Sequence, residues 1–145
     1  MDTVLVNPIK NGKARENDKW GSGHFGAPRG SRQHNGLDIV VTKGQDVLSP
    51  IDGVVVRKSF PYAKDLSYEG VLIEGSGAHE GIMIKIFYMN PVLNIVGANV
   101  RSGDKIGTAQ DLTNKYSDIT NHIHIEVTLD GVSVDPKRVL HGMIP

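Results

Sequence analysis

Asn121-His122-Ile123-His124-Ile125-Glu126 is a stretch in which imidazole side chains alternate with β-branched side chains. Such alternation predicts a β-strand with two chemically different faces. Because residues i and i+2 of a strand share a face, His122 and His124 are expected to point the same way, with Cα atoms about 6.6 to 7 Å apart. Ile123 and Ile125 then face a core. The two imidazoles suit a metal site, which needs further ligands from elsewhere in the chain.

The composition limits what those ligands can be. The chain has 145 residues, which predicts one domain with a sizeable core, and its 17 glycines and 7 prolines indicate many turns. Its 16 basic residues (Lys and Arg) balance 16 acidic residues, which argues against nucleic acid as a partner. The chain has no cysteine, so disulfides, thiolate zinc sites and cysteine nucleophiles are excluded. Any metal must therefore be held by His, Asp or Glu.

Short β-branched runs separated by glycine-containing turns predict the fold class. We expect seven to nine short strands that form an all-β antiparallel sandwich or barrel-like sheet with little helix. Residues 110–116 are the only stretch expected to form a short helix. Residues 1–18 are predicted to be an N-terminal arm, residues 19–140 the domain and residues 141–145 a tail. No apolar run approaches the roughly 18 residues that a membrane span needs, so no membrane insertion is expected.

A second polar pair precedes the β-branched run Ile39-Val40-Val41. If this segment is extended, His34, Gly36 and Asp38 face one way, and the missing side chain of Gly36 leaves room for a small cation between the other two. Together with the histidine pair, these residues could supply three ligands and one open position, the arrangement of a catalytic zinc. Imidazole and carboxylate ligands suit zinc better than magnesium or calcium.

The order of these motifs resembles that of lysostaphin-type, or LytM-like, zinc endopeptidases, over about residues 19–140. The motifs are His34-x-Gly36-x-Asp38-Ile39, Asp52-Gly53-Val54-Val55, Gly103-Asp104-Lys105-Ile106-Gly107, His122-Ile123-His124-Ile125-Glu126 and Asp135-Pro136. The resemblance implies that His34, Asp38 and His124 bind one Zn²⁺ per chain, and that His122 is a catalytic group beside the metal. It also implies a peptide of peptidoglycan, or another glycine-rich or cell-surface peptide, as the ligand. A secreted, periplasmic or virion-associated location is expected with such a ligand.

One feature of the family is missing from this chain. Active members carry a further histidine in a Tyr-x-His-Leu segment, where this chain has Lys85-Ile86-Phe87-Tyr88-Met89-Asn90-Pro91. Matching the tyrosines places that histidine at Asn90, whereas counting back from Gly97-x-x-Val100-x-x-Gly103 places it at Tyr88. We prefer Tyr88, because Met89 then takes the place of the leucine. A phenol can donate a hydrogen bond to an oxyanion but is a poor base at neutral pH.

The same Phe-Tyr-x-x-Pro segment resembles leukocyte-cell-derived chemotaxin 2, a relative of the peptidases that lacks this histidine and is regarded as a binding protein. Two functions are therefore expected to compete: a zinc metallopeptidase that cuts peptidoglycan peptides, and a zinc-stabilised binding module without turnover. A virion or cell-surface adaptor is a third, weaker hypothesis. Tyr88 is expected either to line the groove or to be a buried structural residue. Glu126 is expected either to accept a hydrogen bond from a ligand imidazole or to be a solvated edge residue.

Overall fold

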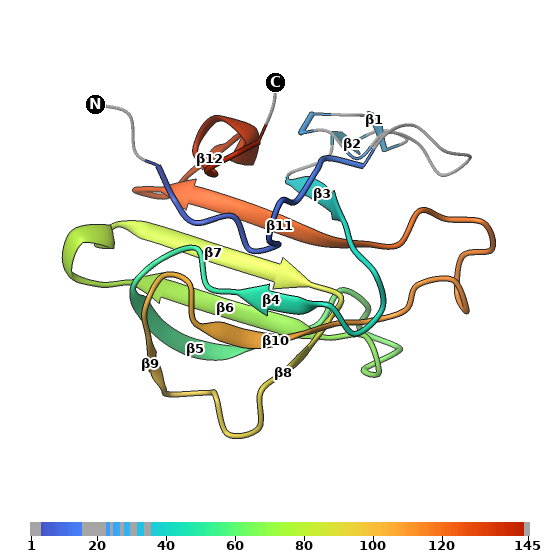
Figure 1. Ribbon diagram of the computed structural model, residues 1–145, viewed down its shortest axis with the longest axis horizontal. Coiled ribbons are helices and arrows are strands. Elements are labelled where there is room, and N and C mark those ends of the chain that lie inside the picture. The colour runs from blue at the N-terminus through green and yellow to red at the C-terminus, as the bar shows by residue number, and fades with distance from the viewer. Residues whose placement is uncertain are drawn as a thin grey trace.

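Three β-sheets, in which all strand pairs are antiparallel, make up the protein (Figure 1). The computed structural model describes residues 4–15, 23, 25–26, 28–29, 32–33 and 36–143. The largest sheet has seven strands, which are β3 (Leu37–Val40), β5 (Gly53–Ser59), β6 (Gly70–Gly75), β7 (Ile82–Phe87), β9 (Asn99–Val100), β11 (His122–Leu129) and β12 (Val132–Val134). The expected all-β antiparallel fold is confirmed.

Two smaller sheets complete the fold. One has the order β4 (Asp46–Leu48), β10 (Lys105–Ala109) and β8 (Met89–Pro91), and the other pairs β1 (Pro28–Arg29) with β2 (Arg32–Gln33). The helical content of the described residues consists of two single turns of 3₁₀-helix, η1 (Gly77–His79) and η2 (Pro136–Arg138). None of the helices in this part of the chain is long and apolar enough to cross a membrane.

Strand β11 has pairing partners on both of its edges in the largest sheet. One of its edges pairs with β7, and its other edge pairs first with β3 and then with β12. The register places His124 directly opposite Asp38 of β3 on one side and opposite Phe87 of β7 on the other. Opposite residues of neighbouring strands are side-chain neighbours, so this pairing alone brings Asp38 to the histidines.

Alternating isoleucines build the core between the sheets. Ile84 and Ile86 of β7 and Ile123 and Ile125 of β11 are fully buried. Burial of such side chains contributes roughly 1.5 to 3 kcal/mol each relative to leaving them exposed. Strand β10 of the small sheet adds the fully buried Ile106 to the same core cluster, and Figure 1 shows β4 and β10 crossing in front of the large sheet.

Two predictions of local structure were wrong. Twelve strands are present in the described residues rather than seven to nine, because several have only two or three residues, too few to show a periodic pattern. The expected helix at 110–116 is absent from a segment that forms turns. There the Asp111 side chain accepts from the backbone of Thr113 and the Asn121 side chain accepts from the backbone of Leu112. Such side-chain bonds compete with a helix for backbone donors.

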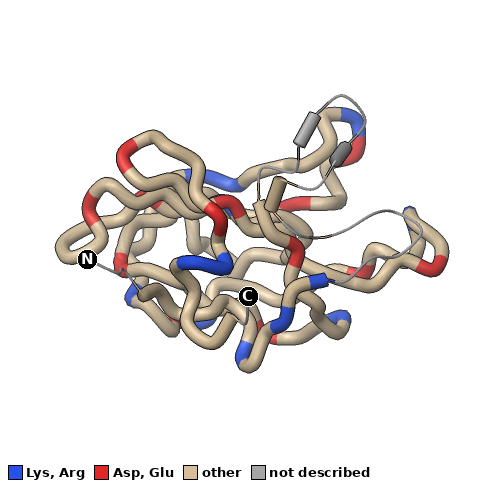
Figure 2. The backbone as a smooth tube through the Cα atoms, turned by 90° about the horizontal axis from the view of Figure 1, so that it is seen from above, with Lys and Arg blue, Asp and Glu red and all other residues tan. Residues whose placement is uncertain are grey.

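The N-terminal segment is packed against the far end of the chain. Leu5 and Ile9 are buried, and Leu5 forms a parallel bridge with Leu140. The predicted boundary at 18/19 falls within residues 16–22, outside the described residues, so it stays a prediction. Figure 2 shows basic and acidic residues interspersed along the chain, in keeping with its net charge of +0.

Candidate metal site

Strands β3 and β11 bring three of the predicted site residues together. Nδ1 of His124 lies 3.0 Å from Oδ1 of Asp38, and Nε2 of His122 lies 3.4 Å from Oδ2 of the same carboxylate. The three residues are 2% (Asp38), 5% (His122) and 8% (His124) exposed. His34, the remaining predicted ligand, lies outside the described residues.

Gly36 allows the chain to approach β11 closely just before β3 begins. A Cβ atom at this position would lie 2.2 Å from the carbonyl oxygen of Ile125 and 3.0 Å from Cε1 of His124. Any side chain here would push the start of β3 away from β11. Gly36 is therefore required for the contact between Asp38 and His124.

Both nitrogens of His124 face carboxylates. Nε2 lies 2.9 Å from Oε2 of Glu126, in addition to the contact of Nδ1 with Asp38, and the ring stacks on Phe87 at a centroid distance of 5.7 Å. Burial lowers the pKa of His124, but the hydrogen bonds to Asp38 and Glu126 outweigh burial, so the pKa is raised. Glu126 thus lies where it can accept a hydrogen bond from His124, and its role behind a metal ligand stays a prediction.

Among the described residues, no group of three or more histidine and carboxylate side chains is placed to hold a metal ion, but two of the predicted ligands lie close together. A neutral imidazole has one N–H, and when Nε2 donates it to Glu126 the lone pair of Nδ1 faces Oδ1 of Asp38. Ligand atoms about 2.0 to 2.2 Å from a tetrahedral zinc lie about 3.3 to 3.6 Å apart, so these two atoms, at 3.0 Å, would move apart slightly to bind one ion. A carboxylate behind a ligand imidazole is also the usual partner that fixes its tautomer. Asp38 and His124 could therefore hold a zinc ion.

His122 is held in one tautomer by the backbone. Its Nδ1 lies 2.9 Å from the carbonyl oxygen of Thr120, which can only accept, so Nδ1 carries the hydrogen. Burial lowers the pKa of His122 and keeps the ring neutral near pH 7, although Asp38 acts in the opposite direction. The unprotonated Nε2 then faces the site.

Arg15 is a site residue that sequence reasoning missed. Its Nη2 and Nε lie 2.9 and 3.1 Å from Oδ2 of Asp38, and its side chain is buried. Its backbone N–H also donates to the carbonyl of Asp38, beside a bridge between Ala14 and Ile39. Nothing in the local sequence of a polar segment indicates this pairing, because the two residues meet only when that segment joins β3.

Tyr88 lies beside His122. The two rings meet edge to face, with centroids 5.5 Å apart and planes at 85°. Asn90, the alternative position for the missing histidine, instead accepts a hydrogen bond from Gln110. Of the two positions, Tyr88 is thus the one that lies beside His122, and its correspondence to the histidine of active relatives stays a prediction.

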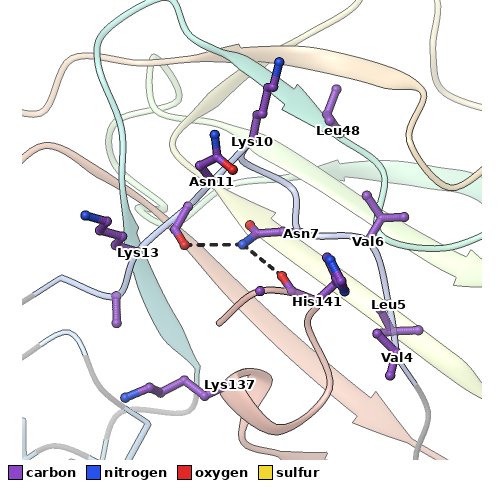
Figure 3. A pocket seen from close by; sticks show the side chains of 13 residues that line it. Val4, Leu5, Val6, Asn7, Lys10, Asn11, Lys13, Leu48, Lys137 and His141 are labelled. Carbon is purple, nitrogen blue, oxygen red and sulfur yellow. Dashed lines mark hydrogen bonds between the residues drawn. The ribbon is translucent and has the colours of Figure 1, made fainter. Parts of the chain in front are cut away.

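A separate hollow of about 1070 Å³ lies between the N-terminal segment and the C-terminal end of the chain (Figure 3). None of the predicted site residues in the described part of the chain lines it. Its lining is Val4, Leu5, Val6, Asn7, Lys10, Asn11, Gly12, Lys13, Ala14, Leu48, Lys137, His141 and Gly142.

Comparison with known proteins identifies the family of the chain. Residues 32–136, which include Asp38, His122 and His124, match the family model of Peptidase family M23. The chain belongs to peptidase family M23. This M23 chain is also 31% identical over 134 residues to leukocyte cell-derived chemotaxin-2 of Mus musculus, a match that covers 87% of the chain and 85% of that protein. Both expected resemblances, to lysostaphin-type peptidases and to the chemotaxin, are confirmed.

Solved structures share the fold of this M23 chain. Helicobacter pylori Csd3 superposes with a TM-score of 0.66 at 20% identity, over 94% of this chain and 35% of Csd3. A zinc containing peptidase from Vibrio cholerae superposes at 0.58 and 24% identity, over 90% of this chain and 39% of that one. The catalytic domain of lysostaphin from Staphylococcus simulans superposes at 0.55 and 20% identity, over 80% and 86%. The M23 chain thus spans little more than a third of the first two proteins.

Proposed function

We propose that this M23 domain is a zinc-dependent metallopeptidase that acts on the peptides of bacterial peptidoglycan, with His34, Asp38 and His124 as zinc ligands. The observation that carries the proposal is the contact of Asp38 Oδ1 with His124 Nδ1, with Nε2 of the same ring secured by Glu126. This is how a catalytic zinc site orients a ligand histidine.

The residues around the site have distinct roles in this proposal. A bound zinc would supply an activated water, with a pKa near 7, and would polarise a peptide carbonyl. Arg15 binds Oδ2 of Asp38 and so fixes the orientation of this carboxylate, whose Oδ1 faces His124. His122 accepts a proton at Nε2, in a tautomer fixed by Thr120.

Tyr88 completes the proposed site as a donor rather than a base. Burial raises the pKa of Tyr88 to about 12, so the phenol stays neutral near pH 7. It can donate a hydrogen bond to a developing oxyanion but cannot take up a proton from water. Catalysis would therefore rely on His122 alone for proton transfer.

A second candidate is a zinc-stabilised binding module without turnover. Tyr88 beside His122 favours it, because the second histidine of active relatives is replaced. The similarity to chemotaxin-2 also fits this candidate. The two candidates share the zinc site and the peptide ligand, and differ only in hydrolysis.

Incubation with purified bacterial cell walls, with and without a chelator, tests the proposal. Chelator-sensitive release of new amino groups is expected of a peptidase, whereas retention on the walls without release would establish the binding module. Tyr88→His should raise or create the activity if the missing histidine is the only defect. No release and no retention would refute cell-wall peptides as the ligand.

A further inference from the structure

All four tyrosines of the chain gather on one side of the candidate metal site. Tyr62 and Tyr68 come from the connection between β5 and β6, Tyr88 from the junction of β7 and β8, and Tyr116 from the turns before β11. The ring of Tyr68 meets the rings of Tyr62 and Tyr88 at 5.7 and 6.4 Å between centroids. Three distant segments therefore build one aromatic cluster.

Three of these tyrosines form a chain of hydroxyl groups. The Tyr62 oxygen lies 2.5 Å from the Tyr116 oxygen and 3.0 Å from the Tyr88 oxygen. A hydroxyl group donates one hydrogen and can accept two. When Tyr116 donates to Tyr62 and Tyr62 donates to Tyr88, these two bonds do not use the hydrogen of the Tyr88 hydroxyl.

Tyr88, at one end of this series of hydrogen-bonded hydroxyl groups, lies beside the candidate metal site. The ring edge contacts His122, whose Nε2 in turn faces Asp38. Tyr88 also has a backbone φ of 72°, a left-handed conformation that costs a non-glycine residue free energy and that gathers at functional sites. The backbone is fixed there by bonds from Tyr88 N to Glu69 and from Gln110 N to Tyr88. The fold thus holds Tyr88 in a backbone conformation that costs free energy.

Lys115 places a positive charge next to the rings of the tyrosine cluster. Its Nζ lies 4.5 Å from the ring centroid of Tyr62 and 5.8 Å from that of Tyr68. A cation on these rings draws electron density from them and makes the phenols better hydrogen-bond donors.

We propose that Tyr116, Tyr62 and Tyr88 form a directed chain of hydrogen bonds whose last hydrogen, on Tyr88, binds a negatively charged oxygen of a peptide ligand. This requires the direction Tyr116 to Tyr62 to Tyr88 to ligand, in which Tyr62 and Tyr88 each accept one bond and donate one. Hydrogen bonds to an anion are about twice as strong as neutral ones, and each link of a chain polarises the next. The inference rests on the proposed function, since it assigns a ligand group to the same site.

Two sources could supply this oxygen, and two probes separate them. Triglycine carries a free carboxylate, with triglycinamide as its neutral control, and a glycyl phosphinate pseudopeptide carries a tetrahedral anion like that formed in hydrolysis. Binding of each probe to the zinc-loaded chain is measured by calorimetry. Tyr62→Phe and Tyr116→Phe should weaken binding of the anionic probe by about three- to tenfold, the value of one hydrogen bond. Triglycinamide should bind all variants equally.

Tyr68→Phe is the matched control, because it removes a hydroxyl from the same cluster that takes no part in the chain of Tyr62, Tyr88 and Tyr116. It should bind both anionic probes as the wild type does. A loss confined to triglycine identifies a carboxylate ligand, and a loss confined to the phosphinate identifies the oxyanion of hydrolysis. The proposal is overturned if Tyr62→Phe weakens neither probe, or if Tyr68→Phe weakens them as much.

The zinc content of each protein distinguishes failure of the proposed function from failure of the proposal about the tyrosines. A wild-type chain that takes up no zinc would refute the proposed function, whereas the preference for an anionic probe can still be measured in that chain. If the Tyr62→Phe variant keeps its zinc and its thermal stability, and binds the probes as the wild type does, only the proposal about the hydrogen-bonded tyrosines is refuted.

Discussion

At the scale of single residues, the ion pair between Arg15 and Asp38 is buried on both sides. Arg15→Met would leave the carboxylate of Asp38 buried without its cation, and such a loss costs about 3 kcal/mol of the free energy of unfolding. Urea unfolding of the metal-free protein measures this cost.

Arg101→Met is the control for that prediction, because Arg101 is exposed and its loss should change stability by no more than about 0.5 kcal/mol. The double variant Arg15→Met with Asp38→Leu should recover part of the loss, since no charge is then left unpaired. Equal stability of Arg15→Met and wild type would show that the pair does not support the fold.

The two histidines of β11 should respond oppositely to pH. The pKa of His122 is lowered from 6.5, so protonation below that value opposes folding, and His122→Gln should lose less stability than the wild type between pH 7 and pH 5. The pKa of His124 is raised, so its contribution is present below 6.5 and is lost as pH rises through the folded-state pKa. The deficit of His124→Gln should therefore be largest at low pH.

Unfolding free energies of the three metal-free proteins across this pH range check both signs. Parallel pH profiles for the two variants would contradict the prediction, because they would mean that the two rings share one environment. Chelator must be present throughout, since zinc would bind only the neutral ligands.

Single residues also show what the sequence could reveal about the site. Strand periodicity decides which side chains share a face. The sequence could therefore predict that His122 and His124 point the same way, and that Asp38 is a candidate to join them. The sequence did not predict that Arg15, Tyr62 and Tyr116 lie near the site. Their contacts join segments that are 23 to 54 residues apart in the sequence, and no local sequence pattern predicts contacts over such a separation.

At the scale of elements, the pairing of β3 with β11 decides whether the site exists. Gly36→Ala would place a methyl group against the backbone carbonyl of Ile125, so one strand must move, at a cost of about 1 to 3 kcal/mol. The movement would also separate Asp38 from His124. We therefore expect zinc affinity to fall together with stability.

Val40→Thr provides the control on the same strand. Val40 is 38% exposed, and this change should alter stability by no more than about 0.5 kcal/mol and leave zinc affinity unchanged. Thermal unfolding and zinc competition measure both quantities. If Gly36→Ala kept wild-type values of both, the close approach of the chain to β11 would not be needed.

Elements also differ in how well the sequence predicts them. The longer strands β5, β6, β7 and β11 follow from β-branched runs between turn residues. Strands of two or three residues, such as β9, form because a neighbouring backbone offers partners, which composition does not reveal. The turns at 110–116 replaced the predicted helix for a related reason, since side-chain acceptors there bind the backbone donors a helix needs.

At the scale of the whole molecule, the hydrophobic core is built without the side chains of the predicted metal ligands Asp38 and His124. One hydrophobic cluster joins the N-terminal segment, the large sheet and the small sheet, and it does not include the predicted ligands Asp38 and His124. A domain with such a core does not need a metal to fold. Zinc should therefore stabilise this protein without being required for its fold.

This separation predicts how zinc removal acts. At a free zinc concentration 100 times the dissociation constant, binding should add about 2.7 kcal/mol to the free energy of unfolding, so chelation should lower the melting temperature while the far-ultraviolet circular dichroism stays that of a β protein. His34→Ala with Asp38→Ala should bind no zinc and melt at the same temperature with or without chelator. Unfolding on chelation would show that the core depends on the metal. An unchanged melting temperature in the wild type would show that these residues bind none, and would remove the basis of both candidate functions.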